Sequence, residues 1–250
     1  PLWSQTTVTG LFDSGRDIEQ LCADIRDAWH QQTQQALPEI DVTLVEDKDW
    51  ERAWMDDFQP LKFGERLWIV PSWHDAPDPD AANLMLDPGL AFGTGTHPTT
   101  ALCLEWLDGQ DPHGKQVIDY GCGSGILGLA ALLLGADHVI GVDTDPQALE
   151  ASRENARRNG VEDSKLDLFL PDNEPETKAD IMLANILAQP LIGLAPHLAS
   201  RTRPGGDLVL SGILSNQARE VMAAYEPWFV MDEPEQREEW IRLTGRRHDR

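Results

Sequence analysis

The spacing of apolar residues in the first part of the chain predicts three short elements. Residues 6–12 are rich in β-forming side chains, and residues 41–45 alternate polar and apolar positions like a half-buried strand. Between them, apolar residues recur at three- and four-residue steps from Asp17 to Gln35, which is typical of an amphipathic helix. Three such elements can hardly bury a core alone.

From about residue 115 the pattern changes to short apolar runs that alternate with amphipathic stretches. The predicted strands are 117–120, 138–142, 165–170, 180–184 and 207–210, and the predicted helices are 124–134, 146–159, 187–200 and 215–224. Repeated strand–helix units of this length indicate an α/β fold, with a mostly parallel sheet and helices on both faces. Residues 228–244 can add two more strands, antiparallel to the rest, which makes a seven-stranded sheet.

The stretch between these two parts differs from both. It is rich in tryptophan, at Trp50, Trp54, Trp68 and Trp73, which we interpret as core packing or a joint between domains. A turn-rich run of Asp, Ala and Pro follows at residues 75–80. We therefore divide the chain into residues 1–45, a linker over 46–80, and a main domain over 81–250.

Composition narrows the class of partner. The 250 residues include 20 Lys and Arg against 43 Asp and Glu, a net charge of −23. Such a surface repels phosphate backbones and suits a basic partner, although a protein from a salty habitat is expected to be equally acidic.

The chain has no apolar run of membrane-spanning length and starts without a signal peptide or an initiator Met, which suggests processing or truncation. Three scattered cysteines without a CxxC pair indicate no zinc, no disulfide framework and a reducing, cytoplasmic setting.

The strongest local motif is a run of glycines, Gly121, Gly123 and Gly125, between the strand at 117–120 and the helix that follows. Glycine permits a tight turn and lets a ligand approach the backbone. The next strand ends at Asp143, whose carboxylate can accept hydrogen bonds from both hydroxyls of a ribose. These residues predict a site for an adenosine-containing cofactor at the carboxyl ends of the strands.

Two cofactors compete for this site. Gly123 to Gly128 matches GxGxxG, the pattern of dinucleotide-binding proteins. Against that interpretation, Gly121 precedes the set, and the acid Asp119 lies beside the turn, where it disfavours a pyrophosphate and suits a cation. S-adenosylmethionine carries an ammonium and a sulfonium, so these residues favour it over NAD. A glycine turn that binds nothing is the remaining alternative.

The same residues carry a family resemblance. Residues 117–127 resemble motif I of the class I S-adenosylmethionine-dependent methyltransferases. Three further segments, 47–54, 86–100 and 184–187, are similar to the bacterial methyltransferases of large-subunit ribosomal protein L11. The resemblance runs from about Leu11 to Arg247 and implies a Rossmann-like fold. It also implies transfer of methyl groups to lysine side chains and the terminal α-amine of that protein.

The resemblance also implies a domain organisation. The family has an amino-terminal substrate-recognition domain, a linker and a catalytic domain. Only the second half of the small domain is expected within residues 1–45, whereas residues 81–250 match the whole catalytic domain. We expect a cytoplasmic monomer that uses S-adenosylmethionine, needs no metal, and binds the basic ribosomal protein rather than nucleic acid or a membrane.

Asn185 is the predicted catalytic residue. Its side-chain carbonyl, just past the strand at 180–184, can accept a hydrogen bond from the attacking amine and aim its lone pair at the methyl group. Asn185 is also assigned to the cofactor site with Thr100, Gly121, Gly123 and Asp143. The alternative for Asn185 is a turn-capping role.

Other residues have weaker claims. Phe92–Thr96 could close over the methionine end of the cofactor. Thr99 could cap a helix that begins near Thr100. His97 could accept a proton from the amine, although solvent can do the same. Asp172 is a candidate for contact with the adenine, and Cys122 is expected to serve packing. An NAD-linked oxidoreductase and a non-catalytic binding module stay open as alternative functions.

Overall fold

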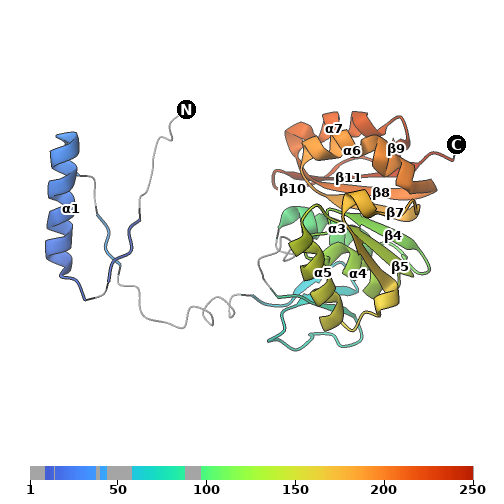
Figure 1. Cartoon of the computed structure of the whole chain (residues 1–250), viewed down its shortest axis with the longest axis horizontal. Helices are drawn as coiled ribbons and strands as arrows, with labels where there is room; N and C mark the ends of the chain where they lie inside the picture. The colour runs from blue at the N-terminus through green and yellow to red at the C-terminus, as the bar shows by residue number, and fades with distance from the viewer. Residues whose placement is uncertain (1–8, 14, 38–39, 44–57, 88–96, 250) are drawn as a thin grey trace. The chain divides into compact units, whose positions relative to one another are not determined.

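The computed structural model describes residues 9–13, 15–37, 40–43, 58–87 and 97–249. The chain consists of two compact units, residues 1–57 and 58–250 (Figure 1).

The first unit contains helix α1 (Ile18–Thr33), which confirms the helix predicted from Asp17 to Gln35. Asp17 is its N-cap, and the Asp17 carboxylate accepts hydrogen bonds from the backbone N–H groups of Glu19 and Gln20 at 3.0 and 3.1 Å. The described parts of the two predicted strands, residues 9–12 and 41–43, are not strands. Their remaining residues, and Trp50 and Trp54, lie outside the described residues.

The second unit is built on one large sheet. Its strands are β4 (Gln116–Tyr120), β5 (His138–Val142), β6 (Leu166–Phe169), β7 (Ala179–Asn185), β8 (Thr202–Leu214), β9 (Phe229–Met231), β10 (Glu235–Arg237) and β11 (Trp240–Arg247). The strand order is β10-β11-β8-β7-β4-β5-β6, and β9 also pairs with β11. The five strands from β8 to β6 are parallel, and β11 runs antiparallel to β8, β9 and β10. The predicted mostly parallel α/β sheet is confirmed, with three tail strands where two were expected.

Helices cover both faces of this sheet (Figure 1). One face carries α3 (Pro98–Asp108), α4 (Ile126–Leu133) and α5 (Pro146–Arg158), and the other carries α6 (Ala188–Arg201) and α7 (Ala218–Tyr225). Alternate residues of the central strands point to opposite faces, so Val117 belongs to the first core and Ile118 to the second. Burial on both faces explains why these strands read as continuous apolar runs.

A small second sheet precedes the large one in the same unit. It consists of β1 (Leu61–Phe63), β2 (Leu67–Val70) and β3 (Ala82–Met85), with β1 antiparallel and β3 parallel to β2. Phe63, Leu67 and Leu84 pack into the core formed with α3 and α4. The predicted linker over residues 46–80 differs from this arrangement, because β1 and β2 are strands of the second unit.

Short three-residue helices complete the connections, at Asp163–Lys165, Pro171–Asn173 and Ser215–Gln217. The last of these occupies the start of the helix predicted over 215–224, so α7 itself begins only at Ala218. Among the residues that the structure describes, no helix is long and apolar enough to cross a membrane.

Candidate functional site

The glycine turn lies between β4 and α4 and has the backbone shape that only glycine adopts freely. Gly121, Gly123 and Gly125 have φ angles of 81°, 56° and 80°. A Cβ on Gly121 would lie 2.2 Å from Cγ2 of Ile186, and one on Gly125 would lie 2.9 Å from Oγ of Ser152. The turn is therefore closely packed against Ile186 and Ser152.

Asp143 follows β5 and is joined to this turn. Its Oδ2 accepts a hydrogen bond from the backbone N–H of Gly123 at 2.9 Å, and its Oδ1 accepts one from the N–H of Asp145 at 3.0 Å. Each carboxylate oxygen can accept a second hydrogen bond. The half-buried carboxylate thus has capacity left for two ligand hydroxyls, as its place at the strand end predicts.

Asp119 lies beneath the turn and is almost completely buried, with 1% of its surface exposed. Its Oδ2 accepts a hydrogen bond from the backbone N–H of Gly128 at 3.0 Å. Burial, opposed by this bond and assisted by the negative charge of Asp143, raises the pKa of Asp119 to about 7. Burial thus favours the neutral form of Asp119, which supports the start of α4 through its hydrogen bond with Gly128.

Asn185 and Thr100, 85 positions apart in the chain, are brought into contact by the fold. The side-chain amide of Asn185 donates to Oγ1 of Thr100 over 3.2 Å, which leaves the carbonyl oxygen of Asn185 for another partner. Asn185 is half-buried at the end of β7, and Thr100 is buried in the first turn of α3.

The backbone after Asn185 is held between two glycines. A Cβ on Gly121 would meet the side chain of Ile186, and one on Gly212 of β8 would lie 2.3 Å from the carbonyl oxygen of Ile186. Gly212 has a φ of 83°, which again favours glycine. This close packing fixes the turn that carries Asn185, and Gly212 was not singled out by its local sequence.

His97, rather than Thr99, is the N-cap of α3. The helix begins at Pro98, and Nδ1 of His97 lies 3.3 Å from the N–H and 2.7 Å from Oγ1 of Thr99. The prediction that Thr99 caps a helix starting near Thr100 is therefore wrong by two residues. The imidazole packs edge-on against Trp240, with ring centroids 4.8 Å apart.

Two residues near the site were missed in the sequence. Trp240 is the first residue of β11 and lies beside Leu214 of β8, past the point where Asn185 pairs with Ser211. Leu187 follows the Asn185 turn and exposes 69% of its surface. The local sequence around Trp240 does not indicate a place near the site, because strand pairing determines which residues become its neighbours.

The remaining candidate residues do not join this group around the glycine turn and Asn185. Cys122 is buried, and burial together with the charge of Asp119 raises the pKa of its thiol, which is consistent with packing. Asp172 is exposed in the short helix after β6. Phe92–Thr96 lies outside the described residues. Within the described ranges, no group of three or more His, Cys, Asp or Glu side chains is placed to hold a metal ion.

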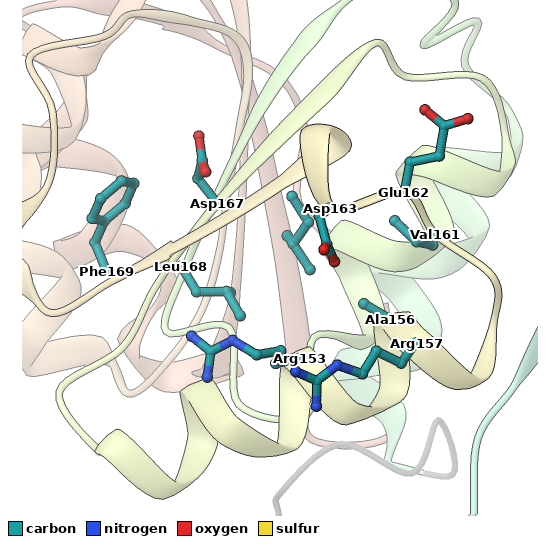
Figure 2. Close-up of a pocket in the computed structure, with 10 residues that line it drawn as sticks. Arg153, Ala156, Arg157, Val161, Glu162, Asp163, Asp167, Leu168 and Phe169 are labelled. Atoms are coloured by element: carbon teal, nitrogen blue, oxygen red, sulfur yellow. The ribbon is translucent and has the colours of Figure 1, made fainter.

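A surface pocket of about 390 Å³ lies elsewhere, between α5 and the edge strand β6 (Figure 2). Arg153 and Arg157 line it from α5, and Leu168 and Phe169 line it from β6. None of the residues assigned to the cofactor or to catalysis lines this pocket. Arg153 already pairs with Glu150 at 2.6 Å, so the pocket does not present a free cation there.

The strand order and the site residues define a class. The chain runs from β4 outward through β5 and β6, then returns to β7 on the other side of β4. Ligands of open α/β sheets bind at such a reversal, and the glycine turn and Asn185 flank it here. This is the arrangement of a class I methyltransferase.

Comparisons with known proteins agree. The chain belongs to the ribosomal protein L11 methyltransferase (PrmA) family, whose model matches residues 1–248. It is 87% identical over 249 residues to the ribosomal protein L11 methyltransferase of Marinobacter nauticus, covering 100% of this chain and 84% of that protein. The predicted family and enzyme class are thereby confirmed.

Solved structures share the fold. The ribosomal protein L11 methylase of Lactobacillus delbrueckii subsp. bulgaricus aligns with a TM-score of 0.69 and 34% identity, over 76% of this chain and 100% of that one. A 16S rRNA methyltransferase of T. thermophilus, solved with AdoMet and guanosine, aligns with a TM-score of 0.50 and 24% identity, over 63% of this chain and 45% of that one. The second likeness concerns the fold alone.

Proposed function

We propose that this protein transfers methyl groups from S-adenosylmethionine to the lysine side chains and the terminal α-amine of ribosomal protein L11, in the cytoplasm. The observation that carries the proposal is the hydrogen bond between Asn185 and Thr100 at the carboxyl end of the sheet, beside the glycine turn. It orients an amide whose free oxygen suits a neutral amine. Membership of the family supports the substrate.

The site residues fit the cofactor. The left-handed backbone at Gly121 and Gly123 forms the tight turn that lets a ligand approach the chain, and Asp143 has acceptor capacity for the ribose hydroxyls. The carboxyl group of Asp119, buried beneath the turn, supports the first turn of α4 through the N–H of Gly128. Bound S-adenosylmethionine would supply an electrophilic methyl group on a positively charged sulfur.

The chain's own contribution to the reaction is alignment. A sulfonium is a good leaving group, so the main requirement is an amine held in line with the methyl carbon. The Asn185 carbonyl would accept a hydrogen bond from the amine N–H and so fix the direction of the nitrogen lone pair. Thr100 holds the amide in that orientation.

Methyl transfer to purified L11 tests this function. We expect mass increments of 14 Da on L11 when S-adenosylmethionine is present, mapped by mass spectrometry to lysines and the amino terminus. A chain that binds S-adenosylhomocysteine by titration calorimetry yet adds no methyl group to L11 would be a binding module. Binding of NAD in its place would favour an oxidoreductase.

A further inference from the structure

A buried ionic cluster anchors the segment that follows β6. Glu174 comes directly after the short helix Pro171–Asn173, and only 7% of its side chain is exposed. Its Oε1 lies 3.2 Å from both Nε and Nη2 of Arg201 and 2.6 Å from Nε2 of His197. Arg201 and His197 are four residues apart on α6, so they face the same side of that helix.

The cluster is partly enclosed. The Glu174 and Arg201 side chains are 7% and 15% exposed, and the His197 side chain, which is 36% exposed, packs its ring edge-on against Tyr120 with centroids 5.6 Å apart. Burial, and then the charge of Glu174, raise the pKa of Tyr120 above its usual range. A carboxylate taken out of water needs such partners, because unpaired it would be costly to bury.

The rest of the segment is less buried than the Glu174 side chain. Asp172 and Asn173 are exposed, and Leu170 and Pro171 are half-buried. Glu174 itself has extended backbone angles, φ −65° and ψ 140°, as the residue before a proline should. Glu174 is therefore the point at which this exposed segment is tied to α6.

The segment also adjoins the cofactor site. It continues from the carboxyl end of β6, where the carbonyl of Phe169 accepts a hydrogen bond from the N–H of Asp143 at 3.2 Å. With the methionine end of the cofactor beside the glycine turn after β4 and the ribose at Asp143 after β5, the base would continue outward in the strand order, toward β6. The base would then lie against residues 170–173.

From this geometry we propose that Glu174, through its contacts with Arg201 and His197, is a positioning residue that sets Pro171–Asn173 against the adenine of the cofactor. The proposal rests on the proposed function. Glu174 touches no reacting atom, and it acts by holding the segment whose polar groups meet the 6-amino edge of the base. Its loss affects base recognition in the ground state and the transition state alike, so it alters affinity rather than turnover.

Calorimetric titration of Glu174→Gln with two probes tests this role. The probes are S-adenosylhomocysteine and S-inosylhomocysteine, in which a carbonyl replaces the 6-amino group. We expect Glu174→Gln to weaken S-adenosylhomocysteine binding roughly tenfold, the size expected when a hydrogen bond to a charged group is lost. The inosine analogue should change less than about twofold, so the preference for adenine falls. The kcat at saturating S-adenosylmethionine should stay within about threefold of the unmodified value.

Asp207→Asn is the matched control. Asp207 pairs with Arg246 at 2.8 Å and Lys115 at 3.7 Å, and its pairing with Ile181 places it at the opposite end of the parallel strands from the site. Neutralising it should leave the affinities for both probes unchanged. A melting curve for each variant reports folding. If Glu174→Gln does not fold, Arg201→Lys replaces it as the test. This variant keeps the positive charge but loses the two guanidinium contacts with Glu174, so it should also lower the preference for adenine.

Equal weakening of both probes, or a fall in kcat with unchanged affinity, would overturn the positioning role while leaving the proposed function intact. Failure of the unmodified protein to bind S-adenosylhomocysteine would instead overturn the proposed function, and this inference with it.

Discussion

At the scale of single residues, the candidate site consists of polar side chains that each have two tasks. Asp143 closes the glycine turn through the N–H of Gly123 and keeps acceptor capacity for a ligand. Asn185 donates to Thr100 and keeps its carbonyl free for an amine. The structural task fixes the side chain before any ligand arrives, which reduces the entropy lost on binding.

Asp143→Ala should weaken S-adenosylmethionine binding by roughly 1.5–3 kcal/mol, because hydrogen bonds to a charged group are lost. Titration calorimetry measures the change. Asp143→Asn, which keeps the shape and one acceptor oxygen, should lose less affinity. If the affinity of Asp143→Ala is unchanged, Asp143 is not part of the cofactor site.

Asn185→Ala should lower turnover far more than it weakens cofactor binding, by roughly 100-fold in kcat, because the lost contact aligns the amine. Steady-state methyl transfer to L11 and cofactor titration provide the two measurements. Thr100→Val removes the hydroxyl that accepts from Asn185 and should give a smaller loss in kcat. Near-normal turnover of Asn185→Ala would contradict the catalytic role.

The buried carboxyl group of Asp119 makes stability depend on pH. Its pKa is about 7 in the folded protein, against roughly 3.9 in an unfolded chain. Between these values the folded state retains a proton that the unfolded state has released. This contribution to the free energy of unfolding therefore falls as pH rises from about 4 to 7, by up to roughly 4 kcal/mol.

Chemical denaturation of the unmodified protein and Asp119→Asn across that pH range isolates the effect. The unmodified protein should lose stability relative to Asp119→Asn as pH increases, because the amide does not titrate. Parallel stability curves for the two proteins would show that Asp119 has no raised pKa.

At the scale of elements, α3 is fixed at both ends. At its start, His97 packs on Trp240 of β11. At its end, the buried Asp108 accepts hydrogen bonds from the backbone N–H groups of Glu65 and Arg66, in the turn between β1 and β2, at 2.6 and 2.9 Å. These contacts tie the helix that carries Thr100 to both sheets of the second unit.

Asp108→Ala should destabilise the protein by about 3 kcal/mol, because two backbone N–H groups lose their buried hydrogen-bond acceptor. Urea denaturation measures the loss. Asp111→Ala is the control, since Asp111 is exposed and accepts from the N–H of His113 in its own turn. A loss for Asp108→Ala no larger than that of Asp111→Ala would contradict the anchoring role.

At the scale of the whole molecule, charge is the dominant feature. The net charge of the chain is −23. Residues 1–60 contribute −9 of it, because they contain 4 basic and 13 acidic residues. Ribosomal proteins are generally basic, so a long-range attraction to such a substrate is expected. Complementary charge raises the association rate more than the final affinity.

If the acidic surface steers the substrate, kcat/KM for L11 should fall as salt rises, because charges are screened over ~8 Å at physiological ionic strength. The affinity for S-adenosylhomocysteine, measured over the same salt series, should barely change. A kcat/KM that is independent of salt would show that the acidity does not guide the substrate and serves solubility.

Features that depend on neighbours in the chain can be predicted from local sequence patterns. The apolar period set the strands and helices from residue 116 onward, and the glycine turn and Asp143 follow directly from strand ends. Contacts between residues far apart in the chain depend on the order of the strands in the sheet. This order brings Asn185 to Thr100, Trp240 to His97 and Glu174 to Arg201, and local patterns carry no information about which distant strands become neighbours. The strands β1–β3 were likewise missed, because their burial comes from packing on α3 and α4 rather than from their own periodicity.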